Sequence, residues 1–270
     1  MTFIQSIVLG IVQGLTEFLP VSSSAHLVFL PRFFAWGEHD IAFDIMLHFG
    51  TLFAVVFYFR KKLWQLILAF FNYKPDITPE VKSDKRLAWL IVFSIIPAGI
   101  VGFFFSDLIE NTFRSSTFMA FNLIFWGLIL YLADRFSKKQ KNQKTLGNIS
   151  WKNNFFIACA QALALIPGTS RSGITMTAGL FSKLDKSSAA EYSFLMSVPI
   201  IFIAGADSLV KLVKNGLGDL NIIILLTGFL FSMISGFLAI SLFLKIIRKW
   251  DFTPFVVYRI LIGLLILFLL

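Results

Sequence analysis

The amino-acid sequence predicts an all-α, polytopic membrane protein. Of its 270 residues, 57% are hydrophobic and only 14% are charged, which is far from the balance of a soluble domain. The apolar residues gather in stretches close to the roughly 20 residues that a helix needs to cross a bilayer. Two further apolar stretches are interrupted by proline and serine. Little length is left for a soluble domain, so residues 1–270 are expected to form a single membrane domain.

Six stretches are apolar and long enough to form complete transmembrane helices. Short loops are expected to join them. The six predicted spans are residues 41–59, 86–105, 117–133, 190–210, 221–244 and 254–270.

Two other apolar regions are too short or too interrupted for comfortable spans. Residues 3–19 run into Pro20 and a serine cluster before a short apolar piece that ends near residue 35. Residues 153–166 run into Pro167, and an apolar piece resumes at 173–182. Irregular backbone at membrane depth is tolerated only where protein buries it or where it lines a cavity. Both regions are therefore predicted to be re-entrant helix-loop-helix hairpins.

The two predicted hairpins resemble each other in sequence. Gln13 and Pro20 precede Ser-Ser-Ser, whereas Gln161 and Pro167 precede Thr-Ser-Arg-Ser. Three spans follow each hairpin, and because three is odd, the second copy must enter the membrane from the opposite face. The chain is thus expected to be an inverted repeat, as in many secondary transporters. The copies would cover residues of about 1–133 and 153–270.

The basic residues are concentrated in four of the predicted loops. These loops carry eighteen lysines and arginines but only six acidic residues, and such an excess is typical of the cytoplasmic side. Both termini are then expected outside the cytoplasm, and the first hairpin should open to the outer surface. The net charge of +9 is thereby interpreted as a topology signal and not as a nucleic-acid footprint. The four loops are residues 60–86, 134–152, 183–186 and 245–251.

Glu17 is a carboxylate inside the first predicted hairpin. It lies four residues after Gln13, so both side chains would share one helix face. An ionisable residue at membrane depth is costly and is by default a candidate functional group. Glu17 is therefore interpreted as a base or an organiser of an anion site. The alternative is a structural carboxylate that accepts hydrogen bonds from serines and backbone amides.

Ser22, Ser23, Ser24 and His26 follow where the next half-helix should begin. Serines at such a position often cap exposed N–H groups, and one or two of the three could do only that. Together with Glu17, they also supply a nucleophile, a base and an orienting group for phosphoryl or acyl transfer. His26 alone would be weak support for such a site.

Arg171 is the corresponding charge in the second hairpin, between Ser170 and Ser172. A guanidinium at membrane depth needs an anion, either a carboxylate of the first hairpin or a bound phosphate. Its planar fork suits phosphate, and the amides from Gly173 to Thr175 would open a helix and favour an anion as well. Both hairpins are therefore expected to direct donors toward one place.

Other ionisable residues receive simpler interpretations. His48 lies on an apolar stretch and is interpreted as a hydrogen-bonded core residue. Asp44 and Glu191 are expected to be helix-start acids or supporting groups, and Arg259 is expected to pair with an acid or a lipid headgroup.

Several kinds of site have no signal in the sequence. There is no Gly-rich nucleotide loop, no Gly-x-Ser-x-Gly elbow and no His-Glu-x-x-His zinc helix. The single Cys159 excludes an internal disulfide framework. No intrinsic cofactor or metal site is expected, although a diphosphate could bring a hard divalent cation, Mg²⁺ or Ca²⁺, on its own oxygens.

Four motifs carry a resemblance to a known family. They are QGLTEFLPVSSSAH at 13–26, PGTSRSGIT at 167–175, AEYSFLMSVP at 190–199 and TPFVVYR at 253–259. With them the chain resembles, over almost its whole length, the bacterial undecaprenyl-diphosphate phosphatases of the bacitracin-resistance type.

The resemblance implies roles for particular residues. The acidic pair of the family falls on Gln13 and Glu17, which leaves Glu17 as the principal carboxylate. The motif serine falls on Ser23 and the family histidine on His26. The phosphate-binding Ser-Arg-Ser falls on Ser170, Arg171 and Ser172. Two departures are mild, since Ser24 stands where threonine is common and Ala25 where glycine is common.

The resemblance also implies a function. The expected reaction is hydrolysis of a C55 polyprenyl diphosphate in the bacterial inner membrane, with the active site facing outward, which would supply carrier lipid for peptidoglycan synthesis. Ser23, His26 or water could be the attacking nucleophile. The rival hypothesis is a transporter or flippase for a polyprenyl phosphate or another anion. A homodimer is a further candidate assembly, and membrane lipids are the expected surroundings.

Overall fold

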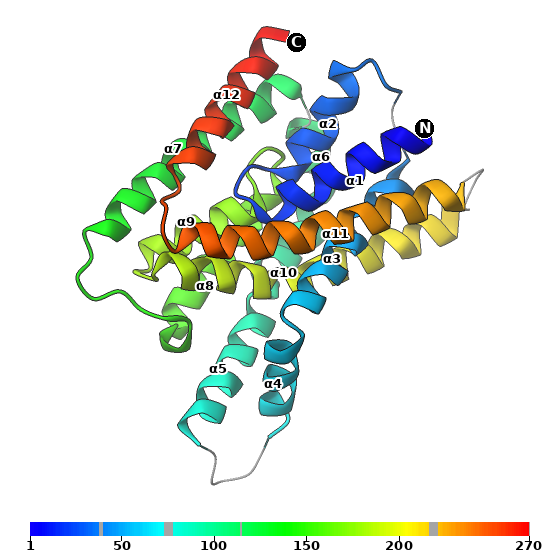
Figure 1. Cartoon of the computed structure of the whole chain (residues 1–270). Coiled ribbons are helices and arrows are strands. Elements are labelled where there is room, and N and C mark those ends of the chain that lie inside the picture. Colours follow the sequence, from blue (N-terminus) through cyan, green and yellow to red (C-terminus); the bar gives the residue numbers. More distant parts are fainter. Residues whose placement is uncertain (38–39, 73–77, 114, 216–220, 270) are drawn as a thin grey trace.

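The computed structural model describes residues 1–270 except 38–39, 73–77, 114, 216–220 and 270. Within these residues the regular secondary structure is helical, apart from one isolated bridge between Lys144 and Leu184. The predicted all-α class is confirmed (Figure 1). The helices are α1 (Phe3–Phe18), α2 (Ser23–Phe33), α3 (Ile41–Tyr58), α4 (Arg60–Phe70), α5 (Pro79–Phe93), α6 (Ile95–Phe113), α7 (Ser116–Lys138), η1 (Leu146–Asn148), α8 (Trp151–Ala162), η2 (Leu163–Leu165), α9 (Arg171–Phe181), α10 (Lys186–Asn215), α11 (Ile222–Ile247) and α12 (Thr253–Leu269).

Five apolar segments within the described residues are long enough to cross a membrane. They correspond to the first five predicted spans. The second of them bends at Ser94, because Pro97 has no N–H to donate to the Phe93 carbonyl, so α5 ends and α6 begins there. The sixth predicted span is α12, an apolar helix of 17 residues, and its expected last residue, Leu270, lies outside the described residues. The number of complete crossings and the re-entrant paths stay predictions.

The two predicted hairpins are the pairs α1–α2 and α8–α9, with η2 at the end of α8. α2 and α9 each have 11 residues, and Ser23 and Arg171, their first residues, are 148 positions apart. The same offset separates Ser22 and Ser170, which precede them and adopt the unusual positive φ angles of 71° and 73°. Gln13 and Gln161 are also 148 positions apart. The hairpins thus have one backbone design.

Glycines let α11 pack closely against α1 and α3. A Cβ atom on Gly14 of α1 would lie 2.5 Å from the Ser232 carbonyl oxygen of α11, and a Cβ on Gly50 of α3 would collide with the Phe229 carbonyl oxygen. Small residues are the usual means by which membrane helices bring their backbones together. This seam fixes α1, and with it Glu17, relative to α3 (Figure 1).

The four basic loops lie together. The Lys138 ammonium is 2.6 Å from Asp251 Oδ2, the Lys144 amide donates to the Lys183 carbonyl oxygen at 2.8 Å, and Arg86 donates to the Gly147 carbonyl oxygen. Each contact joins two of the loops that the charge count assigned to one side. The first of these predicted loops, residues 60–86, is largely helical and not a short loop: α4 and the start of α5 form most of it, pack against each other and project from the bundle (Figure 1).

Candidate active site

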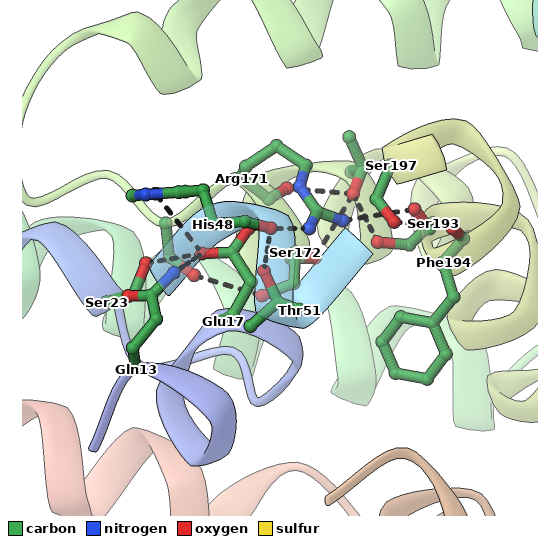
Figure 2. A network of polar contacts seen from close by, with 12 residues as sticks. Gln13, Glu17, Ser23, His48, Thr51, Arg171, Ser172, Ser193, Phe194 and Ser197 are labelled. Carbon is green, nitrogen blue, oxygen red and sulfur yellow. Dashed lines mark hydrogen bonds and ion pairs between the residues drawn. The ribbon is translucent and has the colours of Figure 1, made fainter. Parts of the chain in front are cut away.

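Glu17 is the centre of a polar network that both hairpins build (Figure 2). Its Oε2 atom accepts a hydrogen bond of 2.7 Å from Ser23 Oγ, and its Oε1 atom accepts one of 2.9 Å from Arg171 Nη2. The Glu17 and Arg171 side chains are only 7% and 13% exposed. The carboxylate of one hairpin therefore pairs with the guanidinium of the other, as one of the two sequence interpretations required.

Residues behind this pair hold it in place. Gln13 Nε2 donates to Glu17 Oε2 at 3.1 Å, one helical turn away on the same face. Arg171 Nη1 donates to the Ser193 carbonyl oxygen at 3.1 Å, and Ser193 Oγ lies 2.7 Å from Thr175 Oγ1. These supporting contacts leave the carboxylate and the guanidinium little freedom to turn.

The network faces a small cavity of about 160 Å³ between the hairpins, which we call the phosphate cavity after the ligand that we propose for it below. Its size suits several water molecules or one compact polar group. Both hairpins line it, and α3 adds a histidine. The lining residues are Glu17, Ser22, Ser23, Ser24, His48, Ala164, Ser170 and Arg171.

The two helices that begin at this cavity differ in their caps. Ser170 Oγ accepts a hydrogen bond of 3.1 Å from the Gly173 amide and so caps α9. Ser22 makes no such bond to α2, and its Oγ instead lies 3.1 Å from Ser24 Oγ. Unpaired amides at a helix start attract anions. The start of α2 thus lacks the side-chain cap that α9 has, and residues at the starts of both helices line the phosphate cavity.

His26 does not reach the phosphate cavity. Its Nδ1 is 2.8 Å from the Ser22 carbonyl oxygen, and its Nε2 is 2.7 Å from the Tyr258 hydroxyl. The two rings are stacked, with centroids 5.6 Å apart. The structure thus holds His26 between α2 and α12, away from the lining of the cavity.

His48 is the histidine that lines the phosphate cavity, contrary to the interpretation of a core residue. Its Nε2 is 3.9 Å from Glu17 Oε2, and its side chain is 39% exposed. A lone histidine in an apolar helix gave no signal of this position. The one available clue was the spacing of Asp44 and His48, which places both on the same face of α3.

Arg259 holds the loops of both hairpins, and the expectation of an acidic or lipid partner was wrong. It is fully buried, and its Nη1 donates to the Pro20 carbonyl oxygen at 3.3 Å. Its Nη2 donates to the carbonyl oxygens of Gly168 and Thr169 at 3.2 and 3.0 Å, and its Nε donates to that of Leu123 at 2.9 Å. One guanidinium thus ties the two serine loops together.

An apolar chamber of about 350 Å³ adjoins the phosphate cavity. Glu17, His48, Ala164 and Arg171 line both spaces. The remaining chamber lining is largely apolar and comes from α3, α6, α8, η2 and α10. It includes Ile41, Ile45, Ala98, Leu165, Ile200, Ile201, Ala204 and Gly205.

The described residues do not form a metal site of their own. No group of three His, Cys, Asp or Glu side chains in this part of the chain is arranged to hold a metal ion. The single carboxylate of the phosphate cavity, Glu17, already accepts hydrogen bonds from Arg171 and Ser23 on its two oxygens.

Comparison with known proteins places this geometry in a family. The sequence profile described as bacitracin resistance protein BacA matches residues 6–265. The chain belongs to the BacA family. It is 45% identical over 269 residues to undecaprenyl-diphosphatase 2 of Stutzerimonas stutzeri, covering 100% of this chain and 98% of that protein. It is 44% identical over 269 residues to undecaprenyl-diphosphatase of Campylobacter curvus, covering 100% and 99%.

In this BacA-family chain, most of the expected site residues meet at the phosphate cavity. Glu17, Ser22, Ser23, Ser24, Ser170 and Arg171 line it. The others lie behind it. Gln13 supports Glu17, Thr175 contacts Ser193, and Ser172 Oγ donates to the Leu19 carbonyl oxygen at 2.9 Å. Gly173 is buried beneath Arg259, where a Cβ would lie 2.9 Å from Nη1.

Proposed function

We propose that this chain hydrolyses undecaprenyl diphosphate to undecaprenyl phosphate and inorganic phosphate. Relatives of 44–45% identity over the whole chain carry the name undecaprenyl-diphosphatase. The observation in the molecule that carries the proposal is the Ser23–Glu17–Arg171 network at a cavity that both hairpins line. A carrier would not need a serine held on a carboxylate.

The substrate has two parts that match two adjoining spaces. Its diphosphate would occupy the phosphate cavity, where Arg171 and the uncapped amides of α2 bind negative charge. Its isoprenoid chain would lie in the apolar chamber and leave toward the bilayer. Ile41, at the start of α3, and Ser208 of α10 also line this chamber.

Ser23 is placed to be the nucleophile. Its hydroxyl already donates to Glu17 at 2.7 Å, so Glu17 can accept the proton as Ser23 Oγ bonds to the terminal phosphorus. The bond from that phosphorus to the bridging oxygen breaks, and undecaprenyl phosphate leaves with the electron pair. Water then cleaves the phosphoserine, releases inorganic phosphate and regenerates the Ser23 hydroxyl. Arg171 offsets the charge on the transferred phosphoryl group.

Trapping the intermediate distinguishes Ser23 from its rivals. Rapid quenching of the reaction with ³²P-labelled substrate should leave an acid-stable phosphate on Ser23. An acid-labile label on His26 would assign the attack to histidine, and no label on either residue would assign it to water. The bond of His26 to Tyr258 at 2.7 Å favours Ser23.

The decisive test is phosphate release by purified protein in detergent. Wild-type protein should release phosphate from undecaprenyl diphosphate, whereas Glu17→Ala and Arg171→Ala should lose nearly all activity. Release that neither substitution affects would contradict this site. Vesicle transport measurements on the same variants address the rival hypothesis, since a flippase would move lipid without releasing phosphate.

The proposal also concerns the membrane that holds the chain and the side of this membrane that the active site faces. The basic loops would face the cytoplasm of a bacterial inner membrane, with the termini and the active site on the outer side, where the enzyme would recycle carrier lipid and confer bacitracin resistance. A cysteine at position 26 that reagents reach only from the cytoplasm would contradict this orientation.

The proposal also includes a divalent cation that binds with the substrate and a homodimer of the chain. Because the described residues form no metal site, Mg²⁺ or Ca²⁺ would enter with the diphosphate. Chelation should then lower the rate of phosphate release without lowering the melting temperature. A homodimer should appear as twice the protein mass in detergent-corrected light scattering.

A further inference from the structure

The phosphate cavity has too little positive charge for its proposed ligand. Among the described residues that line it, the Arg171 guanidinium is matched by the Glu17 carboxylate, and the serines are neutral. A lipid diphosphate carries more than one negative charge near neutral pH. A second cation in the lining would strengthen substrate binding beside any metal ion that enters with the diphosphate, and His48 is the other side chain in the described lining that can supply one.

The orientation of the His48 ring leaves one nitrogen for this purpose. Its Nδ1 lies 2.7 Å from the Asp44 carbonyl oxygen. A carbonyl only accepts hydrogen bonds, so Nδ1 carries the hydrogen, and in a neutral imidazole Nε2 is then bare. That Nε2 atom points toward the network (Figure 2), where it lies 3.9 Å from Glu17 Oε2. Protonation of Nε2 would add one positive charge at the edge of the cavity.

His26 is a useful comparison, because a backbone carbonyl oxygen holds its ring in a similar way but its Nε2 atom already has a partner. Its Nδ1 likewise lies 2.8 Å from a carbonyl oxygen four residues earlier, that of Ser22. Its Nε2, however, receives the Tyr258 hydroxyl at 2.7 Å and has no place in the cavity lining. His26 is only 8% exposed, whereas the side chain of His48 is 39% exposed.

We infer that protonated His48 binds a phosphate oxygen of the substrate and makes substrate affinity depend on pH. This inference rests on the proposed phosphatase function. The other titratable groups around His48 in the described lining are Glu17 of α1, Asp44 of α3 and Arg171 of α9, and α10 contributes none. Because only the imidazolium carries this charge, the gain in affinity belongs to low pH, and KM is expected to increase at high pH.

The test compares KM of wild-type protein and His48→Gln at pH 5.5 and pH 8.5. Glutamine keeps a hydrogen-bond donor but cannot be protonated. The KM ratio of variant to wild type should be about tenfold at pH 5.5, because a hydrogen bond to a charged group is replaced by a neutral one, and about twofold or less at pH 8.5. Ionisation of the substrate affects both proteins equally, so it cancels in this ratio.

Controls separate titration from a merely structural role. A packing defect would raise KM by the same factor at both pH values, and such a flat ratio would overturn the inference. His26→Gln, whatever its effect on the rate, should give the same KM ratio at both pH values, and a pH-dependent ratio for that variant alone would also overturn it. Wild-type protein that releases no phosphate at any pH would instead contradict the phosphatase function.

Chemical modification keeps the inference testable should His48→Gln not fold. Diethyl pyrocarbonate should modify His48 of wild-type protein at pH 6, and inorganic phosphate at high concentration should slow that modification, as measured by peptide mass spectrometry. A rate at His48 that phosphate leaves unchanged would contradict the binding role.

Discussion

The two hairpins have the same backbone and different chemistry. In each, a helix ends, a serine adopts a positive φ near 70°, and an 11-residue helix begins. The first residue of that helix is Ser23 in one hairpin and Arg171 in the other, and both contact the same carboxylate, Glu17. One structural position thus provides a hydroxyl on one side of the cavity and a cation on the other.

The difference shows how two similar helix starts can form an asymmetric site. The position that carries Glu17 in α1 is Leu165 in the second hairpin, 148 residues later. One carboxylate between two unlike partners can accept a proton from one and be held by the other. Two copies of either hairpin would instead bring together two carboxylates or two guanidiniums, and like charges at this depth are costly.

The largest expected effect comes from removing the hydroxyl of Ser23, the first residue of α2. Ser23→Ala deletes the proposed nucleophile, and we expect kcat to fall by about 10⁴-fold or more. Phosphate release at saturating substrate measures this loss. Ser24→Ala, next to it in the same lining, should cost only about tenfold. Equal losses for the two variants would remove Ser23 from its special role.

The next largest effect comes from changing the cation at the matching position. Arg171→Ala should lower kcat/KM by about 10³-fold, and Arg171→Lys by about 10²-fold, because lysine keeps the charge but lacks the planar fork. A single ammonium cannot reproduce the two bonds that now join Arg171 to Glu17 and to the Ser193 carbonyl oxygen. Wild-type kinetics for Arg171→Lys would show that only charge matters there.

The serine caps give a smaller effect, which appears in stability. Ser170 caps α9 but Ser22 does not cap α2, so Ser170→Ala should lower the free energy of unfolding by about 1 kcal/mol. Ser22→Ala should change the free energy of unfolding less, because it removes no cap. The positive φ of both serines strains alanine equally in the two variants. Thermal unfolding in one detergent compares the two variants. A larger loss for Ser22→Ala would contradict the assignment of the caps.

The smallest expected effect on stability belongs to an ion pair outside both hairpins. The hydrogen bond from Lys138 lowers the pKa of the Asp251 carboxyl to about 2. The pair therefore contributes stability above the ordinary aspartate pKa and loses it as the pH falls from about 4 toward 2. Asp251→Asn should cost about 0.5 kcal/mol at pH 7 and nothing near pH 2, with activity unchanged. A loss that persists at pH 2 would point to another cause.

The apolar spans and the central pair could be predicted from the sequence, whereas α4 and the start of α5, in the predicted loop 60–86, were missed. Apolar stretches and prolines marked the other helices closely, because hydropathy and helix breaking are local properties. The meeting of Glu17 and Arg171 could be expected as well, since each was an isolated charge at membrane depth beside a serine cluster. Neither conclusion needed knowledge of how the helices pack.

The roles of His26, His48 and Arg259 depend on how the helices pack, so the sequence alone did not reveal them. His26 and His48 are both single histidines, and their packing separates them: His26 bonds to Tyr258 of α12, whereas His48 lines the cavity. Arg259 bonds to backbone carbonyl oxygens, which every residue has, so no partner residue marks its role. Such roles depend on contacts between residues far apart in the chain and leave no periodic pattern.

The buried Arg259 also constrains the order in which the site can be completed during synthesis. Glu17, Ser23 and Arg171 are all translated before α12, yet the guanidinium that fixes both serine loops belongs to this last helix. A nascent chain that has already inserted every proposed catalytic group still lacks the clamp for their backbone. The contacts that hold the proposed site are therefore complete only when α12 has docked beside α7.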